Sequence, residues 1–353
     1  MRVLALIKRI IQQLVRDKRT LALLFVAPLL ILSLMYVLFN SEAREPKLGV
    51  YLQDSTLIQV LEEAEINVTE YEEKVVVEEV ILDDDLDGFL IQDADSVNLT
   101  LRNNDPTSAR ALQMKINQIL AANVQANLVK QLPETITLPN IKLTTKYVYG
   151  SSESAFFDIL SPILIGFFVF FFVFLISGIG LLKERTTGTL ERLLATPIRR
   201  AEIVTAYLAG FGLFAVIQTI IIVLYAINVL DITLVGSIWN VLLINLLLAL
   251  VALSLGILLS AFAASEFQMV QFIPIAIIPQ IFFSGIIPLE GMANWLQAIA
   301  KVMPLYYAAD ALKGVMYMGY AFKDIIFNLG ALVLFAVIFI GLNLIALKKY
   351  RTL

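Results

Sequence analysis

The stretch ILSPILIGFFVFFFVFLISGIGLL, residues 159–182, contains no charged side chain and is long enough to cross a bilayer as a helix. A hydrocarbon core about 30 Å thick needs about 20 apolar residues per helix. Further stretches without Asp, Glu, Lys or Arg lie on both sides of it, at 20–41, 203–230, 232–265, 267–289 and 325–347. The sequence therefore predicts an α-helical polytopic membrane protein with six transmembrane helices, the first over 20–39 and the others within 158–353.

The composition agrees with this class and excludes several kinds of chemistry. Hydrophobic residues make up 59% of the chain and charged residues 16%, whereas a soluble domain carries about 25% charged residues. The chain has no Cys and no His, so it lacks thiolate nucleophiles, imidazole bases and the usual zinc ligands. We expect no catalytic residue, no metal site and no cofactor site, and an intramembrane hydrolase is a poor interpretation.

The charges are distributed along the chain in a way that predicts topology. Residues 40–157 hold 20 acidic and 9 basic residues, whereas Lys and Arg gather before the first span, in the loop 183–202 and in the C-terminal tail. Cytoplasmic loops are enriched in Lys and Arg. The chain is therefore predicted to be a multi-pass protein of the cell membrane, with both termini and loop 183–202 in the cytoplasm and residues 40–157 outside.

Two segments outside the spans have patterns of their own. Residues 1–19 carry apolar side chains at helical spacing among basic ones, which predicts an amphipathic elbow helix at the cytoplasmic membrane surface; a merely basic flank is the alternative. Residues 40–157 predict a small α/β ectodomain. Its expected strands and helix are KLGVYLQ (47–53), EKVVVEEVIL (73–82), DGFLIQ (87–92) and a helix over 108–132 that packs on the sheet through Leu112, Ile116, Ile119, Leu120 and Val124.

An acidic run, DDDLDG at 83–88, resembles the first half of an EF-hand loop. Position 12 of such a loop is Ala94 here, so the bidentate Glu that completes calcium ligation is missing. A solvated acidic turn is therefore favoured over a calcium site.

The segment 284–320 is too long for a turn and too apolar for a solvated loop. Two helical pieces, about 292–302 and 305–317, are separated by Pro304, and neither is long enough to span. Their aromatic residues predict a re-entrant hairpin in the outer leaflet. Pro274 and Pro279 predict a kink in the fifth span, which either forms an outer gate beside Phe282 and Phe283 or only fits the local packing.

Uncharged polar residues lie inside the predicted spans, among them Gln218, Asn245 and Gln280. Amides in hydrocarbon need partners, so ordinary contacts between helices are the favoured interpretation. The alternative is a substrate path formed by these three residues and Phe282. The spans contain no charged residue, which argues against an ion or proton relay and favours a hydrophobic or amphipathic cargo.

The most informative loop is LLKERTTGTLERLLATPIRRAEIV, residues 181–204. Gly188 is expected to be the N-cap of a short helix, with Glu191 reaching back to it, and Pro197 is expected to end that helix at Thr196. Leu190, Leu193 and Leu194 form one apolar side. We interpret this helix as a cytoplasmic lever that docks on a partner protein; a loop that only sets topology is the alternative.

The pattern E-R-x-x-G-T-x-E-x-L-L-x-T-P in this loop resembles the coupling region of ABC transporter type-2 permeases, the membrane subunits of type V exporters. The resemblance implies that the residues meeting the ATPase are Glu184, Arg185, Gly188, Thr189, Glu191, Arg192, Leu194 and Pro197. A second stretch is similar to the same family and implies an outer gate and re-entrant segment with Phe283, Ser284, Gly285, Pro288, Trp295, Pro304, Tyr306 and Asp310.

The resemblance implies a half-transporter that pairs with a second permease copy or a paralogue and binds two ABC ATPase subunits, which hold ATP and Mg²⁺. The sequence agrees on one point, since it contains no GxxxxGK[ST] phosphate loop. The resulting hypothesis is the permease subunit of an exporter that moves a drug, lipid or peptide antibiotic outward by alternating access. It is not itself an enzyme, and its partners include the lipid bilayer but no nucleic acid. The alternative is a membrane-anchored surface receptor or scaffold with a ligand-binding acidic ectodomain.

Overall fold

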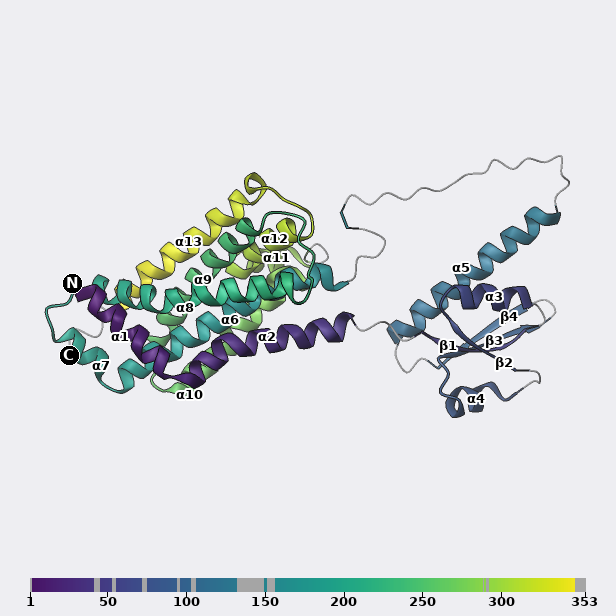
Figure 1. Cartoon of the computed structure of the whole chain (residues 1–353), viewed down its shortest axis with the longest axis horizontal. Coiled ribbons are helices and arrows are strands. Elements are labelled where there is room, and N and C mark those ends of the chain that lie inside the picture. Colours follow the sequence, from purple (N-terminus) through teal and green to yellow (C-terminus); the bar gives the residue numbers. More distant parts are fainter. Residues whose placement is uncertain are drawn as a thin grey trace. The chain divides into compact units, whose positions relative to one another are not determined.

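The computed structural model describes residues 2–40, 45–52, 55–71, 75–93, 96–102, 106–131, 149–150, 156–287, 289 and 292–346. The chain divides into two compact units, one made of Met1–Ser41 and Lys146–Leu353 and the other of Glu42–Thr145. Figure 1 shows that the first is a bundle of helices and that the second contains a sheet.

The first unit is helical throughout its regular structure. In chain order its elements are α1 (Arg2–Arg16), α2 (Lys18–Asn40), α6 (Phe156–Thr186), α7 (Thr189–Leu194), α8 (Arg200–Asn228), α9 (Ile238–Ser260), α10 (Glu266–Ile281), the π-helical turn η1 (Phe282–Ile286), α11 (Asn294–Ala300), α12 (Pro304–Met316) and α13 (Phe322–Ala346). Among the residues that the structure describes, six helices are long and apolar enough to cross a membrane: α2, α6, α8, α9, α10 continued by η1, and α13. The prediction of six candidate spans is confirmed.

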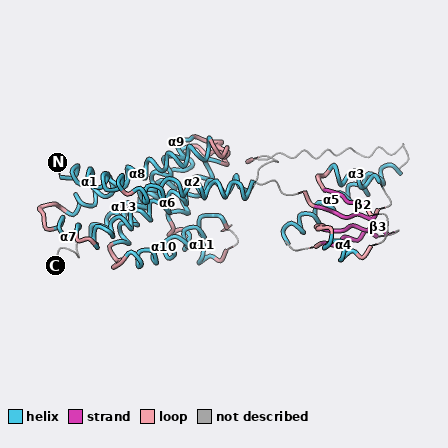
Figure 2. The backbone as a smooth tube through the Cα atoms, turned by 60° about the horizontal axis from the view of Figure 1, so that its bottom comes forward, coloured by secondary structure: helices cyan, strands magenta, loops and turns pink. Residues whose placement is uncertain are grey.

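The centre of the bundle is α6, which packs against α9, α12 and α2 (Figure 2). Its Phe170 and Phe174 rings are fully buried and stacked, with centroids 6.4 Å apart. Helix α9 approaches α6 closely at Gly256, where an added Cβ would lie 2.5 Å from the Phe174 carbonyl oxygen. Small residues permit such an approach between membrane helices, so this crossing depends on glycine.

Helix α1 packs against α8 through Leu6, Ile10 and Leu14, which repeat every four residues and are all buried. Leu4 and Val15, by contrast, are 71% and 55% exposed. Residues 2–16 are thus an amphipathic helix held on the bundle by one face. Its position at a membrane surface stays a prediction.

The segment predicted to be re-entrant contains the two short helices α11 and α12, and Pro304 is the first residue of α12 rather than a separator. Helix α12 is packed among α6, α9 and α13, and its Leu305, Ala308 and Leu312 are completely buried. An interfacial piece would keep one side free, so α12 forms part of the bundle core. Its depth in the bilayer stays a prediction.

The second unit is an α/β fold. Its elements are β1 (Lys47–Tyr51), α3 (Ser55–Glu63), β2 (Asn67–Glu70), α4 (Val77–Asp83), β3 (Gly88–Asp93), β4 (Ser96–Leu101) and α5 (Pro106–Gln131). The sheet order is β2-β1-β3-β4, with β1 parallel to both neighbours and β4 antiparallel to β3. Helices α3 and α5 lie on one face and α4 on the other (Figure 1).

The sequence predicts several of these elements correctly. Strands β1 and β3 and helix α5 form where expected, and Leu112, Ile116 and Ile119 of α5 are buried in the core on the α3 side of the sheet. Leu120 packs at the edge of that core, and the side chain of Val124 lies outside the described residues.

One strand prediction is wrong, because the stretch EKVVVEEVIL contains helix α4 instead. Val77, Val80 and Ile81 pack together in a small core at the spacing of one helical face. Glu78 and Glu79 stand in the first turn of α4, where acidic side chains favour a helix. The run of valines thus predicts a strand, whereas the spacing of Val77, Val80 and Ile81 agrees with the helix that forms.

The acidic run that follows α4 is bound to protein groups. The Asp84 carboxylate accepts a hydrogen bond from the Tyr71 hydroxyl, and Asp85 pairs with Arg102. Asp87 Oδ2 accepts from the Lys47 backbone N–H at 2.9 Å. These carboxylates fasten the turn between α4 and β3, in agreement with the interpretation as an acidic turn.

Candidate functional site

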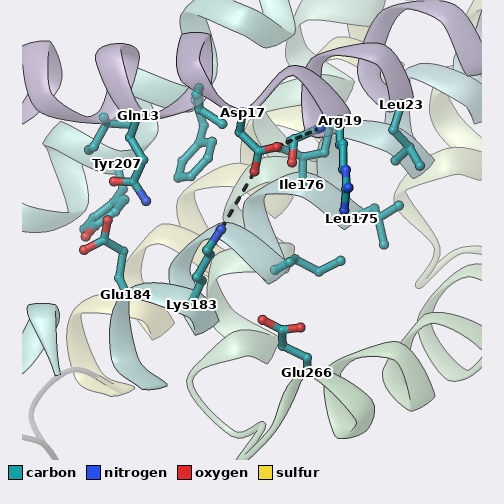
Figure 3. A pocket seen from close by; sticks show the side chains of 16 residues that line it. Gln13, Asp17, Arg19, Leu23, Leu175, Ile176, Lys183, Glu184, Tyr207 and Glu266 are labelled. Atoms are coloured by element: carbon teal, nitrogen blue, oxygen red, sulfur yellow. Dashed lines mark hydrogen bonds and ion pairs between the residues drawn. The ribbon is translucent and has the colours of Figure 1, made fainter. Parts of the chain in front are cut away.

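The candidate coupling loop begins in the last turn of α6, where Glu184 is buried. Its side chain is 4% exposed, and Glu184 Oε2 accepts a hydrogen bond from Arg9 Nη2 at 2.9 Å. The same Arg9 nitrogen lies 3.2 Å from the hydroxyl of Tyr207 in α8, and Figure 3 shows Glu184 beside Tyr207. A buried carboxylate needs such a partner because taking a charge out of water is costly. Glu184 thus joins α6 to α1 and α8.

Arg185 binds the end of α9. Its Nη1 donates to the backbone carbonyls of Ser260 and Ala263, the second at 2.9 Å. The last carbonyls of a helix have no partner within the helix and attract cations. Arg185 therefore holds the loop against the bundle.

The start of α7 differs from the expected capping arrangement. Gly188 is the N-cap residue of α7, as predicted, and has φ +70°, a conformation that glycine adopts without strain. Its N–H donates to the Arg185 carbonyl at 2.9 Å, so it is not available to Glu191. Within the described residues no side chain caps this end, and Arg192 instead donates back to the carbonyls of Thr187 and Gly188. The predicted capping box is wrong here. Its characteristic bond occurs at the next helix, where Glu202 Oε2 accepts from the Arg199 backbone N–H at 2.7 Å.

Helix α7 has an inner and an outer side. Leu190 is 1% exposed and Leu193 packs partly on the core, as the apolar pattern predicts. The side chain of Leu194 lies outside the described residues. The outer side, which we call the α7 outer face, consists of the exposed residues Glu191, Arg192, Ala195, Thr196 and Pro197. Thr189, partly exposed at its edge, shares a hydrogen bond with Thr187.

Helix α1 is attached to this loop at three places. Arg2 Nη1 donates to the Pro197 carbonyl at 2.6 Å, Arg9 pairs with Glu184, and Asp17 lies 3.8 Å from Lys183. The three attached residues are spread along the whole of α1, from Arg2 at its start to Asp17 just beyond its end. Hydrogen bonds from Thr20 hold the pKa of Asp17 below its ordinary value, and Lys183 acts in the same direction.

The sequence interpretation did not identify Arg2, Arg9 or Tyr207 as part of this site. They lie far from the loop in sequence, and Tyr207 reads as one more apolar residue of a span. The signal in the sequence is Glu184 itself, a carboxylate two residues beyond a stretch of 24 residues without charge. Such a group near the end of a span calls for a cation on a neighbouring element.

The residues implied in the outer gate are brought together only in part. Gln280 Oε1 accepts a hydrogen bond from the Leu305 N–H at 3.0 Å, which fastens α10 to the start of α12. In η1, Ser284 donates to the Ile281 carbonyl, and Gly285 has φ +91°. The remaining residues do not come together. Phe283 is partly buried, Trp295 is 66% exposed, and the Tyr306 ring packs edge-on against Tyr307. The Asp310 carboxylate accepts a hydrogen bond from Asn328, and Pro288 lies outside the described residues.

The residues of the possible substrate path do not form one lining. Phe282 is 52% exposed, whereas Gln218 and Asn245 are fully buried. Asn245 Nδ2 donates to the Val241 carbonyl of its own helix at 2.9 Å. In the described part of the chain, neither amide atom of Gln218 has a hydrogen-bond partner. Of these residues, as far as the structure describes them, Gln280 makes the expected contact between two helices, and Asn343 of α13 makes another by donating to the Ser254 carbonyl of α9 at 2.8 Å.

Comparison with known proteins agrees with the resemblance seen in the loop. A family described as "ABC-2 family transporter protein" matches residues 18–345. The chain is 30% identical over 205 residues to ABC transporter G family member 20 of Dictyostelium discoideum, a match that covers 58% of this chain and 28% of that protein. Two Escherichia coli (strain K12) proteins, each described as a probable multidrug ABC transporter permease, are also similar. YbhS is 25% identical over 177 residues, covering 50% of this chain and 47% of YbhS. YbhR is 24% identical over 233 residues, covering 66% and 62%. Each match spans less than two thirds of the relative's own length.

Proposed function

Because the chain belongs to the ABC-2 family of transporters, we propose that it is the permease subunit of an ATP-driven exporter that moves a hydrophobic or amphipathic substrate out of the cell. In this proposal the loop 183–202 and both termini lie in the cytoplasm, and the α/β unit lies outside. A separate ABC ATPase holds ATP and Mg²⁺. Two ATPase subunits and a second permease copy, or a paralogue, complete the transporter.

The single observation that carries the proposal is the two-sided construction of the α7 loop. Glu184 fastens the start of the loop to α1, Arg185 fastens it to the end of α9, and Leu190 is buried. The α7 outer face keeps Glu191 and Arg192 exposed. A loop that only set topology would need its basic residues but not these inward attachments. A loop with exposed charges on one side and attachments to the bundle on the other suits a partner protein that binds the exposed side and moves the loop.

The position of the loop suggests how such a push reaches the spans. A displacement of α7 acts directly on the end of α6, and from there on α1 through Glu184 and on α9 through Arg185, while Arg2 ties α1 to the Pro197 carbonyl beyond α7. Helices α6 and α9 lie in the core of the bundle, and packed helices move as bodies instead of bending continuously. Alternating access would follow if closure of two ATPases tilts these helices together.

The charge of the spans bears on the cargo. The stretches that form them contain no charged residue, and ion pathways through membranes depend on such residues. The two Escherichia coli relatives are described as probable multidrug permeases. A drug, a lipid or a peptide antibiotic is the substrate class we propose, with passage outward beside η1 and α12.

A second permease copy is supported by the apolar surface that one chain leaves uncovered. Ile275 of α10, Leu30 of α2 and Leu334 of α13 are each at least 60% exposed, and they belong to candidate spans. Lipid covers part of this surface, and pairing with another copy would cover more of it.

The test is to co-express the full-length tagged chain with the ABC ATPases of its own source cell, extract the membranes gently and quantify the captured ATPase by mass spectrometry. Glu191→Lys changes an exposed charge on the α7 outer face. Glu62→Lys makes the same change at an exposed position of the α/β unit and serves as the matched control.

We expect the wild-type chain and Glu62→Lys to capture an ATPase that carries a phosphate loop, with ATP hydrolysis in the purified complex, and Glu191→Lys to lose most of both. Capture that is equal in all three proteins would overturn the role of α7. No captured ATPase, together with undiminished substrate export from cells lacking every candidate ATPase, would overturn the exporter proposal and favour the receptor alternative.

A further inference from the structure

A cavity of about 350 Å³ opens beside the coupling loop, between the α1–α2 junction, α6, α8 and the first residue of α10 (Figure 3). This volume falls within the range of sites that hold small organic ligands. The cavity belongs entirely to the helical unit and involves none of the residues implied in the outer gate.

Much of the wall of the cavity is apolar. This part is formed by aliphatic and aromatic side chains of four helices, including Leu14, Leu23, Leu175, Ile176, Ile179 and Phe211. Leu23 and Leu175 face each other at one end in Figure 3. Such a wall favours a ligand with an alkyl or other apolar body, because burying apolar surface yields about 25 cal/mol per Å².

The rim of the cavity carries charges of both signs. Asp17, Lys183 and Glu184 are already engaged, because Asp17 pairs with Lys183 and Glu184 pairs with Arg9. Arg19 and Glu266 are different, since the structure gives neither of them an ion pair or side-chain hydrogen bond within its described residues. Figure 3 shows Arg19 beside Asp17 at the top of the cavity, with Lys183 and Glu266 below them.

A ligand that satisfies all three features has an apolar tail and a head with one negative and one positive group. We propose that this cavity binds a zwitterionic, lipid-like amphiphile, with an anionic group such as a phosphate at Arg19, an ammonium group at Glu266 and its tail along Leu23, Leu175 and Ile179. A purely anionic amphiphile would place its negative charge near Glu266, and a purely cationic one would place its positive charge near Arg19. Both arrangements are repulsive.

The site also touches the candidate coupling loop. Lys183 and Glu184 line the cavity and belong to the same turn as Arg185. A head group at the rim therefore lies directly beside the attachments of α7. Binding itself does not require the proposed transport function, and only its use as the entry point for cargo rests on that function.

The test uses the full-length chain in nanodiscs of uncharged synthetic lipid, without any ATPase. Photoactivatable phosphatidylethanolamine, phosphatidylglycerol and diacylglycerol are added separately, and the labelled peptides are mapped by mass spectrometry. We expect phosphatidylethanolamine to label α2, α6 and the start of α10 most strongly. Arg19→Gln and Glu266→Gln should each weaken this labelling by up to about fivefold, because both residues are exposed and exposed ion pairs contribute little.

Three further variants make the result decisive. Leu23→Trp fills the apolar wall and should abolish labelling, whereas Arg19→Lys keeps the charge and should retain it. Arg16→Gln removes an exposed cation one turn before Arg19, outside the lining, and should leave labelling unchanged.

Equal labelling by phosphatidylglycerol would overturn the zwitterion preference, and labelling unaffected by Leu23→Trp would overturn the site. A correctly folded chain that binds the lipid but captures no ATPase would contradict the proposed function alone.

Discussion

Arg9 and Glu184 form an ion pair across 2.9 Å, which joins the first helix of the chain to the end of α6, 175 residues later. Because the Glu184 side chain is only 4% exposed, its carboxylate needs the opposite charge that Arg9 supplies. The pair therefore fastens α1 to the end of α6, just before α7 begins.

Reversing one charge of the pair should destabilise the bundle strongly. Arg9→Glu leaves the buried Glu184 beside a second carboxylate, and breaking a buried pair costs about 3–5 kcal/mol. The double variant Arg9→Glu with Glu184→Arg should recover part of that loss. Thermal unfolding of the purified chain in detergent measures both effects, and Arg16→Glu on the exposed side of α1 is the control. Independent, additive losses in the double variant would show that the two residues do not interact.

Gly188 should matter for its backbone conformation alone. It has φ +70°, and an added Cβ would meet no heavy atom within 4 Å. An L side chain in this conformation costs about 1–2 kcal/mol, and Asn tolerates it better than Ala. We expect Gly188→Ala to reduce ATPase capture and to lower the melting temperature by a few degrees, and Gly188→Asn to restore much of both. Equal capture by both variants would mean that this conformation is not required.

Gln218 should contribute nothing to stability through its amide. Both amide atoms are buried without a partner in the described part of the chain, and an unsatisfied buried group costs about 1–3 kcal/mol. Gln218→Met should therefore leave the melting temperature unchanged or raise it. Gln280→Met is the matched control and should lower it, because Gln280 accepts from the Leu305 N–H. A marked loss of stability in Gln218→Met would reveal a structural role for that amide.

Tyr71 of the α/β unit should titrate late. Burial, and then its hydrogen bond to Asp84, raise the pKa of Tyr71 to about 12. A folded-state pKa above the unfolded value of 10.0 means that the contribution to stability is complete below pH 10 and is lost as the pH rises through about 12. The phenolate absorbance of the wild type minus that of Tyr71→Phe should have its midpoint near pH 12. A midpoint near pH 10 would contradict the contact with Asp84.

Long sequence patterns predict their part of the fold better than short ones do. The six spans follow from long stretches without charge, a pattern that few other structures produce. The three consecutive valines at 75–77 predict a strand, whereas the structure forms helix α4, in which Val77, Val80 and Ile81 share one face. A segment of seven residues carries too few repeats for periodicity to decide.

The sequence predicts where the coupling loop lies along the chain, but not which distant residues its side chains contact. The motif located α7 and its inner leucine, Leu190, because both depend on neighbouring residues. The Arg9–Glu184 and Arg185–Ala263 contacts depend on how distant helices pack, which hydrophobic pattern alone does not specify. The burial of α12 was missed for the same reason, since its alanines pack only because α6, α9 and α13 surround them.

The central claim is that α7 faces the cytoplasm, opposite the α/β unit, where an ATPase can reach it. Because the chain has no cysteine, Ala195→Cys on the α7 outer face and Leu82→Cys in α4 each introduce a single exposed thiol. The decisive measurement is labelling of intact cells with a membrane-impermeant maleimide, repeated after permeabilisation. The account predicts that Leu82→Cys is labelled in intact cells and Ala195→Cys only after permeabilisation. Labelling of Ala195→Cys in intact cells would contradict it.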